Sequence, residues 1–208
     1  MSAIVSVLQN SISNVGSVCN ALEFLKVPYR VVRTPEELSQ AERLIFPGVG
    51  AFGAAMEHLS NNGLAEVLTQ KVRVEKIPFL GICLGLQLLF EDSEESQGVK
   101  GLGWFKGSVV RLKAQPPQHR VPNMGWCALR SLNLNPSPYP ELDGNFVYFV
   151  HSYAAKPNDT SIISHSAQHA EEFVAGVCEN NIQAFQFQPE KSGKLGLKIL
   201  RVFTQLAS

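Results

Sequence analysis

The segment that most restricts the fold is a short apolar run that leads into a cysteine between two glycines. Residues 78–82 form a short apolar run, as in a buried strand, and residues 84–90 are typical of a helix. Between them stands Gly81-Ile82-Cys83-Leu84-Gly85. A G-x-C-x-G sequence that joins a strand to a helix is the pattern of a nucleophile elbow with cysteine in place of serine. The segment therefore predicts a strand, a sharp turn and a helix, with the thiol at the carboxyl edge of a sheet.

An elbow gives Cys83 a specific chemistry. The flanking glycines permit a strained turn, and a helix N-terminus favours a thiolate. The backbone N–H groups of Leu84 and Gly85 would help to bind an oxyanion. The alternative is a buried, inert cysteine beside a glycine turn. The strand–elbow–helix context favours the nucleophile.

The rest of the first half alternates strands and helices. This alternation predicts a parallel sheet with helices on both faces. The expected strands are residues 3–8, 29–32 and 43–46, the last ended by Pro47-Gly48, and the expected helices are residues 15–25 and 52–75, interrupted near Gly63.

The second half has short strand-like runs separated by turn residues, which are typical of antiparallel ribbons. No linker divides the chain, so we expect an α/β fold in one domain over residues 1–208, with a mostly parallel central sheet, flanking helices and additional antiparallel strands. The runs are residues 107–112, 125–129, 146–150, 161–166, 172–178 and 183–187. A loop is expected at 133–140, between the second and third runs, and a helix at 196–206, after the last.

Charge and cysteine usage exclude several classes of protein. The 208 residues carry 18 basic and 18 acidic side chains, which gives no reason to expect binding to nucleic acid or an anionic membrane. The four cysteines form no C-x-x-C pair, so we expect neither a metal site nor a disulfide framework. The first residues lack the pattern of a signal peptide and no run is long enough to span a membrane, so we expect a cytoplasmic protein.

A second glycine loop follows the strand expected at residues 43–46. It reads Phe46-Pro47-Gly48-Val49-Gly50. Its backbone donors would lie beside Cys83 if the two strands are neighbours, although an ordinary strand-to-helix turn is the simpler interpretation. No phosphate-binding lysine or G-x-G-x-x-G sequence is present, so no nucleotide cofactor is expected.

With these two loops, the sequence resembles the class I, or triad, glutamine amidotransferases, whose fold is flavodoxin-like. Within them it is most similar to the glutaminase subunits of imidazole glycerol-phosphate synthases, over most of the chain. The matching motifs are Pro47-Gly48-Val49-Gly50, residues 81–90, Ser93-Glu94-Glu95, Gly101-Leu102-Gly103, Met124-Gly125-Trp126, residues 148–153, Gln186-Phe187 and residues 189–192.

The resemblance implies that Cys83 attacks the side-chain carboxamide of glutamine, while a histidine oriented by Glu190 handles the protons. Ammonia then passes to a (β/α)₈-barrel cyclase subunit in a heterodimer of histidine biosynthesis. The implied positions are Val49 and Gly50 in the oxyanion loop, Gln87, Glu95, Ser152 and Tyr153 around glutamine, and Lys191 and Asn14 near the subunit interface.

The sequence departs from the family pattern at three places. Gln188 stands where the family has the triad histidine, Asn123 replaces a histidine, and residues 9–14 replace a glycine-rich loop. A glutamine amide cannot act as a general acid or base. Losing a triad member costs on the order of 10⁴-fold in turnover. His151 lies in a matching motif, and we interpret it as structural rather than as a substitute base.

Three functions remain open from the sequence. The chain is a glutaminase subunit for imidazole glycerol-phosphate synthesis, weakened by Gln188; or a paralogue that supplies ammonia to a sugar amidation enzyme; or a non-catalytic regulatory subunit of the barrel partner. The identity of the partner and an assay of glutamine hydrolysis would separate them.

Overall fold

A nine-stranded mixed sheet forms the centre of the molecule in the computed structural model, which describes residues 4–10, 15–132 and 138–206. The strand order is β2-β1-β3-β4-β12-β11-β10-β7-β8. The first five strands are parallel, and the remaining four continue the sheet in antiparallel fashion. The strands are β1 (Val5–Leu8), β2 (Tyr29–Val32), β3 (Leu44–Gly48), β4 (Phe79–Cys83), β7 (Asn123–Ser131), β8 (Phe146–His151), β10 (Ile163–Gln168), β11 (Glu172–Glu179) and β12 (Ile182–Phe185).

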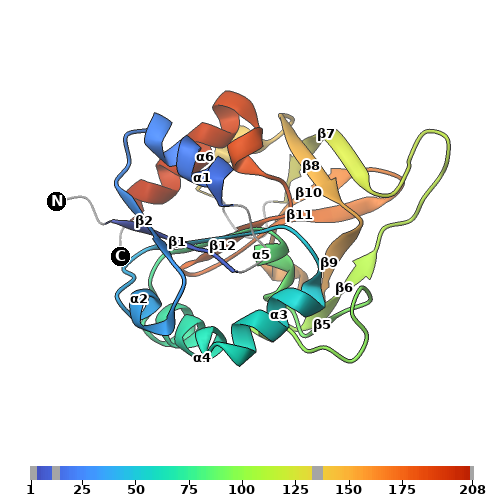
Figure 1. The fold of residues 1–208 in the computed structure, drawn as a ribbon. Helices are drawn as coiled ribbons and strands as arrows, with labels where there is room; N and C mark the ends of the chain where they lie inside the picture. Colours follow the sequence, from blue (N-terminus) through green and yellow to red (C-terminus); the bar gives the residue numbers. More distant parts are fainter. Residues whose placement is uncertain (1–3, 11–14, 133–137, 207–208) are drawn as a thin grey trace.

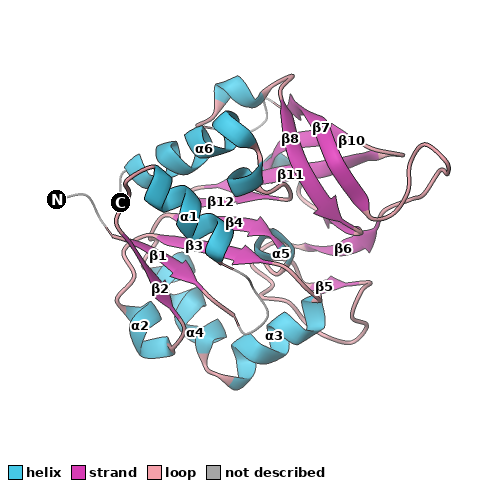
Figure 2. Cartoon of the chain, turned by 45° about the horizontal axis from the view of Figure 1, so that its top comes forward, coloured by secondary structure: helices cyan, strands magenta, loops and turns pink. Residues whose placement is uncertain are grey.

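Helices cover both faces of the parallel part (Figure 1). Helices α1 (Gly16–Phe24) and α6 (Gly193–Gln205) lie on one face. The other face carries α2, α3 and α4, as the turned view in Figure 2 shows. Their bounds are α2 (Pro35–Ser39), α3 (Phe52–Asn61) and α4 (Leu64–Thr69), continued by the π-helical η1 (Gln70–Val74).

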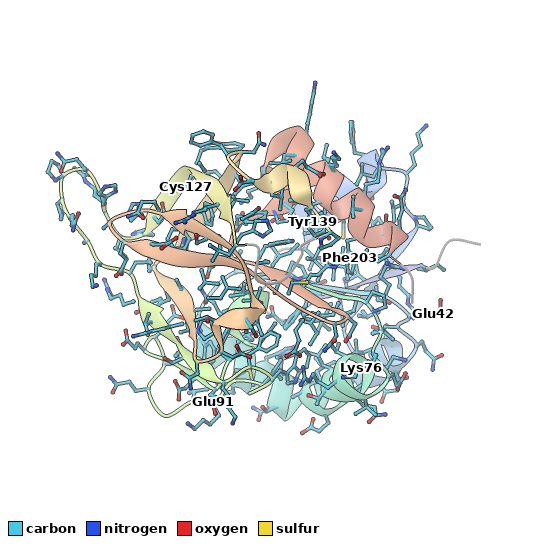
Figure 3. The ribbon with its side chains drawn as sticks, turned by 180° about the vertical axis from the view of Figure 1, so that it is seen from behind. Glu42, Lys76, Glu91, Cys127, Tyr139 and Phe203 are labelled. Carbon is cyan, nitrogen blue, oxygen red and sulfur yellow. The ribbon has the colours of Figure 1, made fainter. Side chains whose placement is uncertain are left out.

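Each face of the sheet has its own hydrophobic core. Beneath α1 and α6, Phe203 and Tyr139 are fully buried together with Phe185 (Figure 3). The second core, with Phe46 and Phe52, lies beneath the other helices. Burial of these large side chains is the main force that holds the helices to the sheet.

A small second sheet packs beside the main one. It consists of β5 (Asp92–Ser93), β6 (Gly107–Arg111) and β9 (Tyr153–Pro157). The helix that follows the elbow, α5 (Leu84–Gln87), is short. Three 3₁₀ turns complete the described fold: η2 (Pro140–Leu142), η3 (Thr160–Ile162) and η4 (Pro189–Lys191).

The α/β fold class with additional antiparallel strands is confirmed, and three details differ. β3 was expected to end at Phe46, but it continues through Pro47 and Gly48. Pro47 lies beyond the last residue of β3 that pairs with β1, so its missing N–H breaks no hydrogen bond between these two strands. The run at 183–187 is antiparallel only toward β11, since its other neighbour β4 is parallel. β9 was not predicted, and part of the loop expected at 133–140 lies outside the described residues.

Among the described helices, none combines the length and the apolar character needed to cross a bilayer.

Candidate active site

The turn at Cys83 is a strained elbow. Cys83 is the last residue of β4 and has φ 54° and ψ −107°, a region that non-glycine residues seldom occupy. A Cβ on Gly85 would lie 2.0 Å from the carbonyl oxygen of Phe46, so only glycine permits α5 to approach β3 so closely. The elbow thus points the thiol away from the strand at the carboxyl edge of the parallel sheet.

The thiol opens into a cavity of about 280 Å³. Seven of the predicted oxyanion and glutamine residues line it, and Gly85 does not, because it packs against Phe46 instead. Three lining residues were not among the predicted ones: Pro122, Val150 and His151. The predicted residues in the lining are Val49, Gly50, Leu84, Gln87, Glu95, Ser152 and Tyr153, around Cys83 itself.

The glycine loop reaches the cavity because β3 and β4 are parallel neighbours. Gly48 pairs with Cys83 in the ladder, so Val49 and Gly50 continue beside the elbow. Gly50 has φ 106°, which suits glycine in particular. The carboxylate of Glu95 accepts a hydrogen bond from the backbone N–H of Phe52 at 2.8 Å, which ties the wall of the cavity to the first turn of α3.

Gln188 and Glu190 lie behind the thiol despite the intervening sequence. The Gln188 side chain is close enough to Cys83 to lower the pKa of its thiol. The backbone N–H of Gln188 donates to Tyr148 O at 3.0 Å, and its carbonyl oxygen accepts from Ser192 Oγ at 2.7 Å. The buried atoms Gln188 Oε1 and Glu190 Oε2 have no hydrogen-bond partner. The three predicted catalytic residues therefore lie close together, but no chain of hydrogen bonds through Gln188 and Glu190 links them.

Electrostatics favour the neutral thiol. Burial raises the pKa of Cys83 to about 11, and the nearby charge of Glu190 acts in the same direction. A helix N-terminus was expected to lower the pKa of Cys83, so the observed direction is the opposite. The dipole of α5 is small because the helix has only four residues, and burial therefore dominates. Burial also raises the pKa of Glu190 to about 7.

His151 is buried and fully hydrogen-bonded. Its Nδ1 lies 2.8 Å from Tyr153 O, and its Nε2 lies 3.2 Å from Asn123 Nδ2. A carbonyl oxygen only accepts, so Nδ1 carries the hydrogen and Nε2 accepts from the Asn123 amide. Burial lowers the pKa of His151 to about 4 and keeps the ring neutral. Both nitrogens are occupied, which favours the structural interpretation over that of a substitute base.

A buried glutamine that was not among the predicted site residues also touches the thiol. Gln186 Nε2 donates to Cys83 Sγ at 3.6 Å. The sequence signal for it was its place in the Gln186-Phe187 motif, two residues before Gln188. Strand alternation gives no further signal, because β12 ends at Phe185 and the chain bends at residues 186 and 187.

Lys191 and Asn14 were the two residues expected near a subunit interface. Lys191 is exposed in η4, and Asn14 lies outside the described residues. Within the described part of the chain, no three His, Cys, Asp or Glu side chains gather as a metal ion would require.

Known proteins resemble this chain in sequence and in fold. The class I glutamine amidotransferase family matches residues 6–205. The HisH subunits of imidazole glycerol phosphate synthase from Methanocaldococcus jannaschii and Bacillus subtilis are 38% and 40% identical, over 97% and 98% of this chain and 99% and 97% of theirs. The chloroplastic hisHF protein of Arabidopsis thaliana is 44% identical over 97% of this chain, which spans 34% of that protein.

Two solved structures, of a glutamine amidotransferase and of PurLQS from Thermotoga maritima, share the fold with a TM-score of 0.72 at 18% identity. They cover 96% and 98% of this chain, and it covers 96% and 98% of theirs. On the sequence matches, the chain belongs to the class I glutamine amidotransferases, and within them to the family of imidazole glycerol phosphate synthase HisH subunits.

Proposed function

We propose that this chain is the glutaminase subunit of an imidazole glycerol phosphate synthase and that it hydrolyses glutamine slowly through Cys83. The observation that carries the proposal is the strained Cys83 elbow at the wall of a cavity of about 280 Å³. That volume is at the small end of the roughly 300–1,000 Å³ typical of ligand pockets, which suits an amino acid.

The reaction has two steps. Cys83 Sγ bonds to the carboxamide carbon of glutamine while the carbon–nitrogen bond breaks, and ammonia leaves with the thiol proton. Water then adds to the thioester carbon, the carbon–sulfur bond breaks, and glutamate and the thiol are regenerated. In this mechanism the backbone N–H groups of Gly50 and Leu84, two residues that line the cavity with Cys83, stabilise the oxyanion in both steps.

Proton transfer limits this chemistry. A thiol with a pKa of about 11 is ionised in about one molecule in ten thousand at neutral pH. Neither the amide of Gln188 nor the hydrogen-bonded His151 is available as a general base to accept the thiol proton. A non-catalytic, regulatory subunit is therefore the second candidate. No described feature favours a sugar amidation enzyme as the acceptor.

A (β/α)₈-barrel cyclase subunit is the proposed partner, in a heterodimer. The HisH subunits and the hisHF protein are named as parts of imidazole glycerol phosphate synthase. On this chain Met124, Trp126 and Phe146 are exposed on β7 and β8. Met124 pairs with the cavity residue Val150, and the other two lie further along the same two strands. We call these three residues the ribbon patch. Tyr148 N donates to Ser192 Oγ, which anchors η4 and its exposed Lys191 beside this ribbon.

We further propose a single domain over residues 1–208 and a cytoplasmic location. Both cores pack on one sheet, which supports the single domain. Among the described residues, Cys19, Cys83 and Cys127 form no disulfide, which suits a reducing compartment.

The test is steady-state glutamine hydrolysis by the complex with its barrel subunit. We expect a slow rate that Cys83→Ala abolishes, with ammonia and glutamate in equal amounts. A rate that persists in Cys83→Ala would overturn the role of Cys83. No hydrolysis by the unmodified complex, with normal barrel binding, would favour the regulatory function.

A further inference from the structure

Gln186 is a polar side chain with no access to solvent, directly beneath the candidate active site. It is 0% exposed. Its Nε2 donates to Cys83 Sγ at 3.6 Å, and its Oε1 accepts from Gln87 Nε2 at 3.1 Å. Burying an amide is costly unless its partners are fixed, so this arrangement is specific.

Gln87 determines which end of the Gln186 amide faces the sulfur. The other hydrogen of the Gln87 amide goes to Tyr153 O at 3.0 Å. With both hydrogens of Gln87 donated, Gln186 must offer its oxygen to Gln87 and its NH₂ group to Cys83. The thiol in turn donates toward Val150 O at 3.9 Å, so the sulfur lies between a donor and an acceptor.

We propose that Gln186 is a positioning residue that orients the Cys83 sulfur toward the cavity and stabilises its thiolate, with Gln87 as the clamp. The inference rests on the proposed role of Cys83 as the nucleophile. A hydrogen bond to an ionised group is roughly twice as strong as one between neutral groups, so this donor favours the thiolate over the thiol.

The other groups around the sulfur also affect the ionisation of the Cys83 thiol. Glu190 in η4 faces the thiol and its charge opposes ionisation. Glu95, Tyr153 and the neutral His151 line the same cavity. The backbone N–H of Leu84 and the amides of Gln186 and Gln188 act in favour of the thiolate. In a site without the triad histidine, these neutral donors are what stabilises the anion.

The test is a pH titration of Cys83 in the full chain, followed by the ultraviolet absorbance of the thiolate as the difference from Cys83→Ser. Gln186→Met keeps the length of the side chain and removes the donor. We expect the thiolate fraction at a given pH below the pKa to fall about tenfold, an upward shift of about one pKa unit. Alkylation of Cys83 by iodoacetamide, measured on its peptide, should slow to a similar degree.

Gln183→Met is the matched control, because Gln183 is another buried glutamine nearby and accepts from Tyr139 Oη rather than touching Cys83. It should leave the titration unchanged. An unchanged titration in Gln186→Met, or an equal shift in Gln183→Met, would overturn the proposal. If circular dichroism shows that Gln186→Met does not fold, Gln186→Asn replaces it. Its amide is shorter by one methylene and so is drawn away from the sulfur, and we expect the same upward shift in the titration of Cys83. Neither readout needs glutamine turnover, so an inactive glutaminase and a failed clamp are distinguishable.

Discussion

At the scale of single residues, Gln188 is the departure from the family pattern that bears most directly on the proposed chemistry of Cys83. Cys83 keeps the elbow, the cavity and the neighbouring backbone donors, while Gln188 occupies the place of the base. The unpaired Gln188 Oε1 and Glu190 Oε2 show that the glutamine does not complete the hydrogen-bond chain that a ring N–H would. The defect is therefore one of proton transfer and not of architecture.

Restoring a histidine at this position should restore much of the activity. In Gln188→His, a ring N–H can donate to Glu190 Oε2 while the other nitrogen faces Cys83 Sγ. We expect glutamine hydrolysis by the complex to rise by roughly 10³-fold or more. Steady-state release of glutamate measures it. Gln188→Asn, which changes the side chain without adding a base, should give no gain, and an equal rate for the two variants would contradict the argument.

The buried carboxyl of Glu190 should make stability depend on pH. Its pKa is raised from an unfolded value near 4.5 to about 7, so the folded state prefers the protonated form. The associated stability is present below pH 4.5 and is lost as the pH rises through about 7. The free energy of unfolding of Glu190→Gln, measured with urea, should thus equal that of the unmodified chain near pH 4.5. Near pH 8 it should be higher by up to about 3 kcal/mol. Glu42→Gln, at an exposed position, is the control; a difference that does not vary with pH would refute the prediction.

At the scale of elements, local sequence patterns predicted those strand bounds and helix breaks that depend on neighbouring residues. β2 (Tyr29–Val32) was predicted to the residue, and the break expected near Gly63 lies before α4, where Gly63 has a left-handed backbone. α2 was missed although Thr34 and Glu37 form a capping box, because the helix has only five residues. Strand partners were harder, since β12 joins the parallel strands through contacts about a hundred residues apart.

The close approach of α5 to β3 should be sensitive to a single methyl group. A Cβ at position 85 would meet a backbone oxygen at 2.0 Å, which a side-chain rotation cannot relieve. We expect Gly85→Ala to lower the free energy of unfolding by at least about 2 kcal/mol. Gly98→Ala is the control, because no atom lies within 4 Å of the added carbon and only its positive φ opposes the change, at about 1 kcal/mol. Urea unfolding compares the two, and equal losses would show that packing at Gly85 is not tight.

At the scale of the whole molecule, the site assembles from several separate parts of the chain. The elbow and the glycine loop meet because β3 and β4 are neighbours in the sheet, and the end of β8 reaches Cys83 through Val150. Glu95 and Pro122 complete the lining of the cavity. Most lining residues were predictable from motifs that resemble a known family. His151 and Val150 as lining residues, and the reversed pKa shift of Cys83, required the packed structure because burial is a property of the assembled fold.

The ribbon patch should carry the contact with the barrel subunit. Trp126 is 53% exposed and stacks edge-on with Tyr148, so it offers a large, rigid apolar surface near the mouth of the cavity. Aromatic anchors of this kind contribute most of the binding energy at interfaces. We expect Trp126→Ala to weaken the heterodimer by about 2 kcal/mol, roughly 30-fold in Kd, measured by isothermal titration calorimetry with the barrel subunit. Phe24→Ala removes an aromatic ring that is 73% exposed on α1, and it should bind like the unmodified chain. Equal weakening by both variants would mean that the loss is not specific to the ribbon patch, and normal binding by Trp126→Ala would place the interface elsewhere.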